Sequence, residues 1–202
     1  MVDRTNVNDR RVVRTRAAVV AAFDTLLLEK DMSQITVTDI AREANIDRKT
    51  FYTHFGSVDG LVDYIVDTEM ASIHERLKNR MQECGEAGVS DNLEIMLEVI
   101  GETIRESRIV NKKNANLAPA RRLARALHDV ILKTIDECGG PLASLEEDAK
   151  DCVITFMVLG TAAVYRCKTI DHPSMSDEEV SSIAVQLVSG GIRSYGKSLA
   201  AR

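Results

Sequence analysis

Apolar residues recur every three or four positions along most of the chain, which is the period of a helix with one buried face. The pattern predicts a first helix at residues 8–30, two short helices at 36–44 and 48–54, and a long helix at 58–84. Further helices follow, separated by polar or glycine-containing breaks. No stretch alternates with the period of a β-strand, and only 3 prolines interrupt the 202 residues. We therefore expect an all-α fold of about nine helices.

The two short helices carry clear signals at their ends. Thr36 or Thr38 can cap the first and Asp47 can cap the second, because their side-chain oxygens accept hydrogen bonds from free backbone amides. Asn45 lies between the helices, where the chain needs a left-handed backbone that asparagine tolerates better than most residues. Gly56 ends the second helix. Two short helices joined by a tight turn and packed on a third form a helix-turn-helix, whose second helix enters the major groove of DNA.

Charge is distributed unevenly along the chain. The formal net charge of −5 by itself argues against a nucleic-acid partner. Residues 1–60 are neutral, with nine basic and nine acidic side chains, so the net negative charge lies in residues 61–202. The first sixteen residues hold five arginines against two aspartates. An acidic protein can still bind DNA when its basic groups converge on one face.

No catalytic, metal-binding or membrane motif is found in the sequence. It lacks the fingerprints of serine hydrolases, zinc proteases, P-loop proteins and dinucleotide-binding enzymes, so we expect no enzyme, no cofactor and no metal. The 4 cysteines lack metal-binding spacing and are expected to be small buried side chains. The longest apolar run, residues 152–165, is too short to span a bilayer and is expected to be a core or interface helix. With no signal peptide, a cytoplasmic protein is expected.

The segment ITVTDIAREANIDRKTFYTHFGSVDGL, with the preceding helix RTRAAVVAAFDTLLLEK, resembles the TetR/AcrR family of transcriptional regulators. The matching positions are Ile35, Thr36, Val37, Asp39, Ile40, Ala41, Ala44, Thr50, Tyr52, His54, Phe55 and Leu61. The resemblance covers about residues 10–65. It implies an N-terminal three-helix helix-turn-helix domain and a C-terminal helical domain for ligand binding and dimerisation. We expect these domains at residues 1–56 and 57–202.

Three positions depart from the family pattern. Asn45 replaces the glycine of the turn, Asp47 replaces a serine, and Val58 replaces a lysine that meets a phosphate in the family. The first two replacements keep the backbone conformation and the helix cap. At Val58 one contact to the DNA backbone is expected to be missing, and Ser57 with the nearby helix amides can partly replace it.

The motif and the resemblance predict two sets of DNA-binding residues on one face. The residues expected to reach base edges are Arg48, Lys49 and Thr53. Arg48 is suited to a bidentate contact with guanine. The set expected to donate to phosphates, without reading sequence, is Thr36, Thr50, Tyr52 and His54. Thr38 is expected to touch a base or a phosphate. A packing role for Tyr52 and a capping role for His54 are the alternatives, while Phe51 and Phe55 are expected in the core.

The N-terminal arginines form a basic arm in this interpretation. The arm contains Arg10, Arg11, Arg14 and Arg16. These side chains would add positive charge near the DNA backbone or reach into a minor groove. The alternative is that the segment is a solvated tail.

For the second domain, the resemblance implies a small-ligand pocket and a dimer interface. Pocket residues are predicted on the helices that surround the family's pocket: Met96, Ile100, Leu127, His128, Met157 and Tyr165. The alternative is that the methionines and His128 are ordinary core or surface residues. The last two helices are apolar enough to form a four-helix interface with a second copy. A homodimer would place two recognition helices on half-sites about one helical turn apart, or a multiple of it.

We therefore expect a sequence-specific regulator that binds a palindromic double-stranded DNA operator, most simply a repressor that a small-molecule effector releases. The alternative is a co-regulator controlled by a protein partner, because RKTFYTHFGSVDGL is similar to a TetR-like subgroup that includes activators of dihydroxyacetone kinase operons. Neither interpretation involves a membrane.

Overall fold

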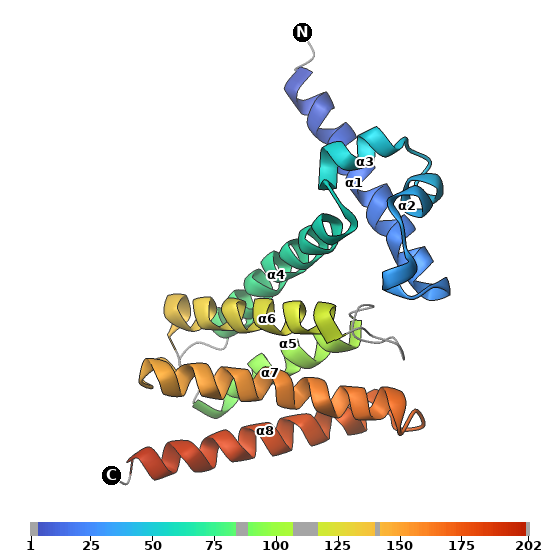
Figure 1. Ribbon diagram of the computed structural model, residues 1–202. Coiled ribbons are helices and arrows are strands. Elements are labelled where there is room, and N and C mark those ends of the chain that lie inside the picture. Colours follow the sequence, from blue (N-terminus) through green and yellow to red (C-terminus); the bar gives the residue numbers. More distant parts are fainter. Residues whose placement is uncertain (1–3, 84–88, 107–116, 140–141, 201–202) are drawn as a thin grey trace. The chain divides into compact units, whose positions relative to one another are not determined.

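The chain is helical throughout the part that the computed structural model describes, which is residues 4–83, 89–106, 117–139 and 142–200 (Figure 1). The α-helices are α1 (Arg4–Glu29), α2 (Val37–Glu43), α3 (Arg48–Phe55), α4 (Val58–Glu83), α5 (Val89–Glu106), α6 (Leu117–Cys138), α7 (Glu147–Ile170) and α8 (Asp177–Ala200). A short 3-10 helix covers Met32–Gln34. The all-α class is confirmed, with eight α-helices in the described residues where the sequence predicted about nine helices.

The described chain divides into two compact units, and the division falls inside α4. The first unit contains residues 4–67, and the second begins at Thr68. This is eleven residues beyond the boundary expected after residue 56, because the first turns of α4 pack on the short helices. The Tyr64 ring on α4 lies 5.4 Å from the Phe55 ring on α3, and the Arg16 guanidinium of α1 lies 5.1 Å from the Tyr64 ring centre.

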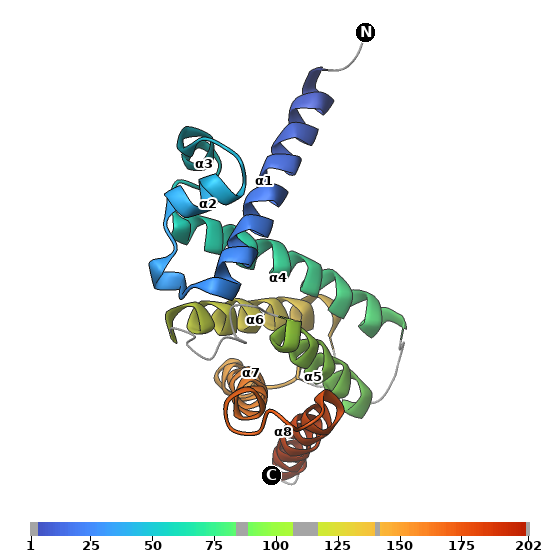
Figure 2. The same ribbon diagram turned by 90° about the vertical axis from the view of Figure 1, so that its right-hand side faces the viewer.

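The first unit packs α2 against both α1 and α3 (Figure 2). Its core consists of side chains that are completely buried, among them Val19, Phe23, Ile40, Phe51 and Leu61. Phe55 is 8% exposed, so both phenylalanines of α3 lie in the core as expected. Since the apolar face of α3 is used for packing, its polar face remains for solvent or a partner.

The basic segment before the first core residues is helical. α1 begins at Arg4, earlier than the predicted start at residue 8, so Arg10 and Arg14 lie exposed on a helix. Arg16 is half-buried and stacks on Tyr64, which removes it from the predicted basic arm. The expected arm is therefore one side of a helix that carries fewer available arginines.

The second unit is built around α7, which packs against α5, α6 and α8, while α5 also packs against α8. Figure 1 shows α6, α7 and α8 one below another. The core is aliphatic and includes Leu93, Ile100, Leu127, Ile131, Met157 and Val188, each no more than 2% exposed. These helices thus form one continuous core.

Helix α7 has an exposed apolar side as well as a buried one. By length and composition alone α7 could cross a membrane, whereas the apolar run of residues 152–165 had been expected to be too short. A core helix that packs inside a protein meets the same criterion of length and hydropathy. Phe156 and Leu159 are each 52% exposed on its outer side. Cys152 and Cys167 are exposed on α7, which corrects the expectation that they are buried, and Cys138 is partly buried. Cys84 lies outside the described residues.

Candidate nucleic-acid interface

Helix α2 begins with a complete capping box. The Thr36 side chain accepts from the Asp39 amide at 3.2 Å, and the Asp39 carboxylate accepts from the Thr36 amide at 3.1 Å. The Thr36 hydroxyl also donates to Asp39 at 2.8 Å. Its single proton is therefore used within the protein, so the predicted donation from Thr36 to a phosphate would require this bond to break.

Asp39 ties the capping box to the end of α1. Its Oδ1 lies 3.2 Å from Lys30 Nζ and 3.2 Å from the Arg42 guanidinium. The side-chain and backbone hydrogen bonds from Thr36, followed by that from Lys30, lower the pKa of Asp39 to about 2. The Asp39 carboxylate thus holds the first turn of α2 against the end of α1. The sequence motif contains this aspartate, but the motif alone does not predict its contact with Lys30.

The turn between α2 and α3 takes the left-handed form that the sequence predicts. Asn45 has φ 52°, the one non-glycine residue with positive φ in the described chain. The Ile46 amide then donates to the Ala41 carbonyl at 2.9 Å, which closes the turn. Asparagine therefore supplies the left-handed backbone conformation that this turn needs.

The recognition helix α3 is capped by Asp47, as expected. Its carboxylate accepts from the Thr50 amide at 2.7 Å and from the Thr50 hydroxyl at 3.0 Å. These two hydrogen bonds, the backbone one first, lower the pKa of Asp47 below its usual value, so the carboxylate is ionised at neutral pH. The Thr50 hydroxyl proton, like that of Thr36, is already donated to a carboxylate.

The residues predicted to read bases share the exposed side of α3. Arg48, Lys49 and Thr53 are all exposed. The Thr53 hydroxyl donates to the Lys49 carbonyl at 2.8 Å, which leaves its lone pairs and its methyl group for a base. Tyr52 is 54% exposed, so its ring is not a core residue. The arrangement presents two cations and a tyrosine hydroxyl from a helix eight residues long.

A hollow of about 760 Å³ lies beside the recognition helix, within the first unit. It is lined by α1, the turn and α3, through Arg11, Val12, Thr15, Asn45, Ile46, Asp47, Thr50 and His54. His54 thus shares the hollow with Arg11, which the sequence had placed in the arm. Thr38 is exposed in the first turn of α2.

The start of α4 depends on two small residues. The Ser57 hydroxyl oxygen accepts from the Gly60 amide at 3.0 Å and caps the helix. A Cβ atom added to Gly60 would lie 2.1 Å from the Phe55 carbonyl oxygen, so only glycine fits where α3 ends against α4. Sequence reasoning missed Gly60, because this close approach joins two helices and leaves no local pattern. Val58 is the first residue of α4.

Among the six predicted ligand residues, His128 lines a cavity that the other five do not line. Five of them are at most 4% exposed and belong to the packed core: Met96, Ile100, Leu127, Met157 and Tyr165. The Tyr165 hydroxyl lies so close to Gly101 that a Cβ there would be 2.9 Å from it. These five side chains are buried in the second unit, and their role in ligand binding stays a prediction.

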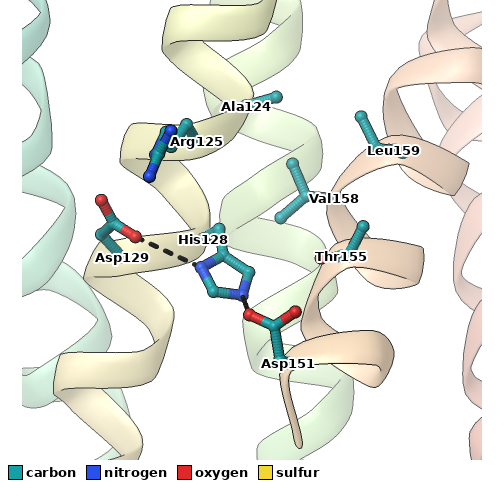
Figure 3. Close-up of a pocket in the computed structure, with 8 residues that line it drawn as sticks. All are labelled: Ala124, Arg125, His128, Asp129, Asp151, Thr155, Val158 and Leu159. Atoms are coloured by element: carbon teal, nitrogen blue, oxygen red, sulfur yellow. Dashed lines mark hydrogen bonds and ion pairs between the residues drawn. The ribbon is translucent and has the colours of Figure 1, made fainter. Parts of the chain in front are cut away.

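His128 instead lines a separate cavity of about 330 Å³ between α6 and α7 (Figure 3). Its Nε2 lies 2.9 Å from an Asp151 carboxylate oxygen on α7, and its Nδ1 lies 3.3 Å from Asp129 on α6. Arg125 lines the same cavity. Both carboxylates that line this cavity therefore contact the His128 ring. Among the described residues, no group of three His, Cys, Asp or Glu side chains could hold a metal ion.

Comparison with known proteins supports the motif. Residues 20–65 match the family model "Bacterial regulatory proteins, tetR family". An uncharacterised HTH-type transcriptional regulator, YxbF of Bacillus subtilis strain 168, is 44% identical over 70 residues, which are 34% of this chain and 18% of that protein. The chain therefore matches only about a fifth of the length of this curated relative.

Solved structures share the fold over most of the chain. The fatty acid degradation regulator FadR from Bacillus halodurans has a TM-score of 0.63 at 14% identity, covering 89% of this chain and 96% of that one. FadR from Thermus thermophilus, described as a TetR-family transcriptional repressor in complex with lauroyl-CoA, has a TM-score of 0.57 at 18% identity, covering 86% and 92%. The match over residues 20–65, together with the helix-turn-helix built by α1–α3, makes this part of the chain similar to the TetR family of bacterial regulatory proteins.

Proposed function

We propose that this protein is a sequence-specific DNA-binding transcriptional regulator, a repressor that binds a palindromic operator as a homodimer and is released by an effector. The observation that carries the proposal is the exposed face of α3, where Arg48, Lys49 and Tyr52 project from a helix whose opposite face is buried in the first unit. A short capped helix with cations on its free side suits insertion into a major groove.

The predicted residues divide by chemistry in this proposal. Arg48 and Lys49 donate to base edges, with Thr53 beside them, and Tyr52 donates to a phosphate. The hollow beside α3 adds Arg11, Thr15 and His54 as groups that can face a neighbouring phosphate. In the free protein Thr36 caps α2, and the hydroxyl protons of Thr36 and Thr50 are both donated to aspartates.

The apolar faces of α7 and α8 support the homodimer. Phe156, Leu159, Ile183 and Leu187 are 39–64% exposed, while Val180, Ala184 and Val188 of α8 are buried. A helix that is apolar on two sides buries one side in its own unit and needs a second surface for the other. A second copy provides an equivalent face, and the two pairs of helices then form a four-helix interface.

The operator is tested by selecting genomic DNA fragments with the purified protein and footprinting the enriched sequence. We expect a palindrome with half-sites about one helical turn apart. Arg48→Ala is expected to cost about 1–3 kcal/mol and to relax the preference at one base pair of each half-site. Binding without sequence preference at physiological salt, unchanged in Arg48→Ala, would overturn the proposal.

The effector is proposed to be a small molecule, and a long-chain acyl-CoA is the first probe because the Thermus thermophilus FadR structure contains lauroyl-CoA. If the protein answers to such a ligand, lauroyl-CoA at micromolar concentration is expected to weaken operator binding, measured by fluorescence anisotropy. The control is free coenzyme A, which lacks the acyl chain.

Control by a protein partner is the second candidate, and the packing of the second unit favours it. Ile100, Leu127 and Met157 are at most 1% exposed, so a ligand among these side chains would have to displace core contacts. Operator binding that resists a broad set of small molecules but changes on adding a co-purifying protein would support this candidate over the first.

A further inference from the structure

The hollow beside α3 is a mainly polar space within the first unit. It has a volume of about 760 Å³ and is lined by α1, by the turn between α2 and α3, and by α3 itself. Of the side chains that line it, Val12 and Ile46 are hydrocarbon and the others are polar. Arg48 and Lys49, the proposed base contacts, directly follow Asp47 of the lining. The hollow therefore lies next to the start of the recognition helix.

Three polar side chains of the lining are already engaged within the protein. The Thr15 hydroxyl donates to the Arg11 carbonyl at 2.9 Å. The two carboxylate oxygens of Asp47 accept from the amide and from the hydroxyl of Thr50, at 2.7 Å and 3.0 Å. The negative charge of Asp47 is thus directed at Thr50 and partly offset by these two donors. An occupant of the hollow would have to bind to the other polar groups.

The other polar groups of the lining are hydrogen-bond donors. They are the Arg11 guanidinium, the Asn45 amide and the His54 imidazole, and no hydrogen bond or ion pair of these side chains is found within the residues that the structure describes. Arg11 and Asn45 are exposed, and His54 is half-buried. An imidazole has at least one N–H in either charge state, so each of the three groups can donate. A positive charge and several free donors suit an anion that is rich in acceptor oxygens, such as a phosphate.

Asn45 is held in place by backbone contacts alone. Its amide donates to the Arg42 carbonyl at 3.2 Å, and the next amide, of Ile46, donates to the Ala41 carbonyl at 2.9 Å. The side chain of Asn45 therefore adds no hydrogen bond to the turn within the described chain. Its φ of 52° would be adopted more easily by glycine. What asparagine adds at this position is a side-chain amide at the hollow.

The helical form of α1 limits the kind of DNA contact that Arg11 can make. An α-helix with its side chains is about 10–12 Å wide, whereas the minor groove of B-DNA is about 6 Å wide. The N-terminal part of α1 extends beyond α3 as a continuous helix (Figure 1, Figure 2), so it cannot enter a minor groove as an extended arm would. The DNA groups that remain within reach of Arg11 are phosphates.

We propose that the hollow between α1 and α3 holds one phosphate of each operator half-site, and that Asn45 and Arg11 are DNA-contacting residues that donate to this phosphate together with His54. The inference rests on the proposed function, because α3 brings the hollow to the DNA. Donors from α1, the turn and α3 then meet at one group. Since phosphates carry no sequence information, the contact adds affinity and fixes the position of α3 without reading a base.

The contact is tested with the full-length protein and operator duplexes in which one phosphate at a time is replaced by an uncharged methylphosphonate. At one position of each half-site, we expect the replacement to weaken binding of the wild type about tenfold, because a charge-assisted contact is lost. The same replacement should have little further effect on Arg11→Gln and a reduced effect on Asn45→Gly. Glycine adopts positive φ freely, so Asn45→Gly keeps the turn.

Arg10→Gln is the matched control, because it removes the same charge from an exposed arginine of α1 that does not line the hollow. It is expected to keep the wild-type sensitivity to that methylphosphonate. If Arg10→Gln removed this sensitivity as Arg11→Gln does, general attraction to α1 and not the hollow would explain the contact, and the proposal would be wrong.

The dependence of binding on salt gives a second measurement. Arg11→Gln is expected to reduce the slope of log K against log salt concentration by about 0.9 for each half-site. Asn45→Gly is expected to leave the slope unchanged and to weaken binding about fivefold for each half-site. If the two variants lose sensitivity at different phosphates, or at none while the wild type binds its operator, the shared phosphate contact is refuted and the proposed function stands. A wild type that selects no operator would refute both.

Discussion

The hydroxyl groups in and near α3 differ in whether they already donate a hydrogen bond within the protein. Those of Thr36, Thr50 and Thr53 are donated within the protein, to Asp39, Asp47 and the Lys49 carbonyl. For Tyr52, no such donation is found in the part of the chain that the structure describes, and the residue is 54% exposed. Tyr52 is therefore the side chain best placed to give a new hydrogen bond to a phosphate.

Tyr52→Phe is expected to weaken operator binding about fivefold, since one hydrogen bond contributes about 1 kcal/mol and the ring is retained. The loss should be the same for the operator and for sequences with single base changes, because phosphates carry no sequence information. Anisotropy titrations with a small panel of operators measure this. A changed ranking of the panel would mean that Tyr52 contacts a base.

Thr36→Ala is expected to lower the free energy of unfolding by about 1 kcal/mol, the usual effect of losing a helix cap. Thr36→Ser keeps the hydroxyl and is expected to stay near the wild type. Urea denaturation followed by circular dichroism measures both. If Thr36→Ala is as stable as the wild type but binds DNA poorly, the Thr36 hydroxyl donates to a phosphate and does not stabilise α2 as a cap.

Asp39 makes stability depend on pH in the acid range. Its pKa is about 2 in the folded protein, below the ordinary value of 3.8. A lowered folded-state pKa contributes stability that is fully present above the unfolded value and is lost as pH falls toward the folded one. We expect the melting temperature to fall between about pH 4 and pH 2, with a smaller fall in Asp39→Asn. Parallel slopes for the two proteins would contradict this role.

At the scale of elements, what the sequence predicts depends on how local the interaction is. The caps at Thr36 and Asp47 and the positive φ of Asn45 were all predictable, because each involves neighbours within a few residues. Interactions between distant segments could not be predicted, since no regular spacing of residues in the sequence indicates them. Arg16 stacks on Tyr64, and Met157 is buried in the core of the second unit, and both positions depend on residues far apart in the sequence.

Gly60 is the clearest element-scale constraint. Gly60→Ala is expected to destabilise the protein by about 3 kcal/mol, because its Cβ would meet the Phe55 carbonyl, which is backbone and cannot rotate away. Gly160→Ala is the matched control within α7, where the nearest atom would be Val188 Cγ2 at 3.6 Å. That control is expected to be neutral or more stable by about 0.5–1 kcal/mol. Thermal unfolding distinguishes the two, and equal effects would argue against the close approach.

At the scale of the whole molecule, the outer face of α7 and α8 is expected to decide the oligomeric state. Leu187→Asp places a charge on that face, since Leu187 is 64% exposed in the single chain. We expect a monomer in analytical ultracentrifugation and at least a tenfold loss of operator affinity, because two half-sites are no longer bound together.

Leu28→Asp is the matched control for that variant, because Leu28 is 75% exposed on α1. It is expected to leave the oligomeric state unchanged. A dimeric Leu187→Asp protein would place the interface elsewhere.

If the protein binds an operator as proposed, the aspartate that caps α3 affects how it searches a genome. Asp47 keeps its negative charge at neutral pH, next to Arg48 and Lys49 at the start of the same helix. Non-specific affinity for DNA comes from attraction to phosphates, and a fixed anion at the point of closest approach offsets part of it. In the proposed function, time spent on random sequences is therefore expected to be shorter, whereas base contacts compensate at a matched operator. We expect the cap to increase the ratio of specific to non-specific binding, which governs occupancy when competing sites are numerous.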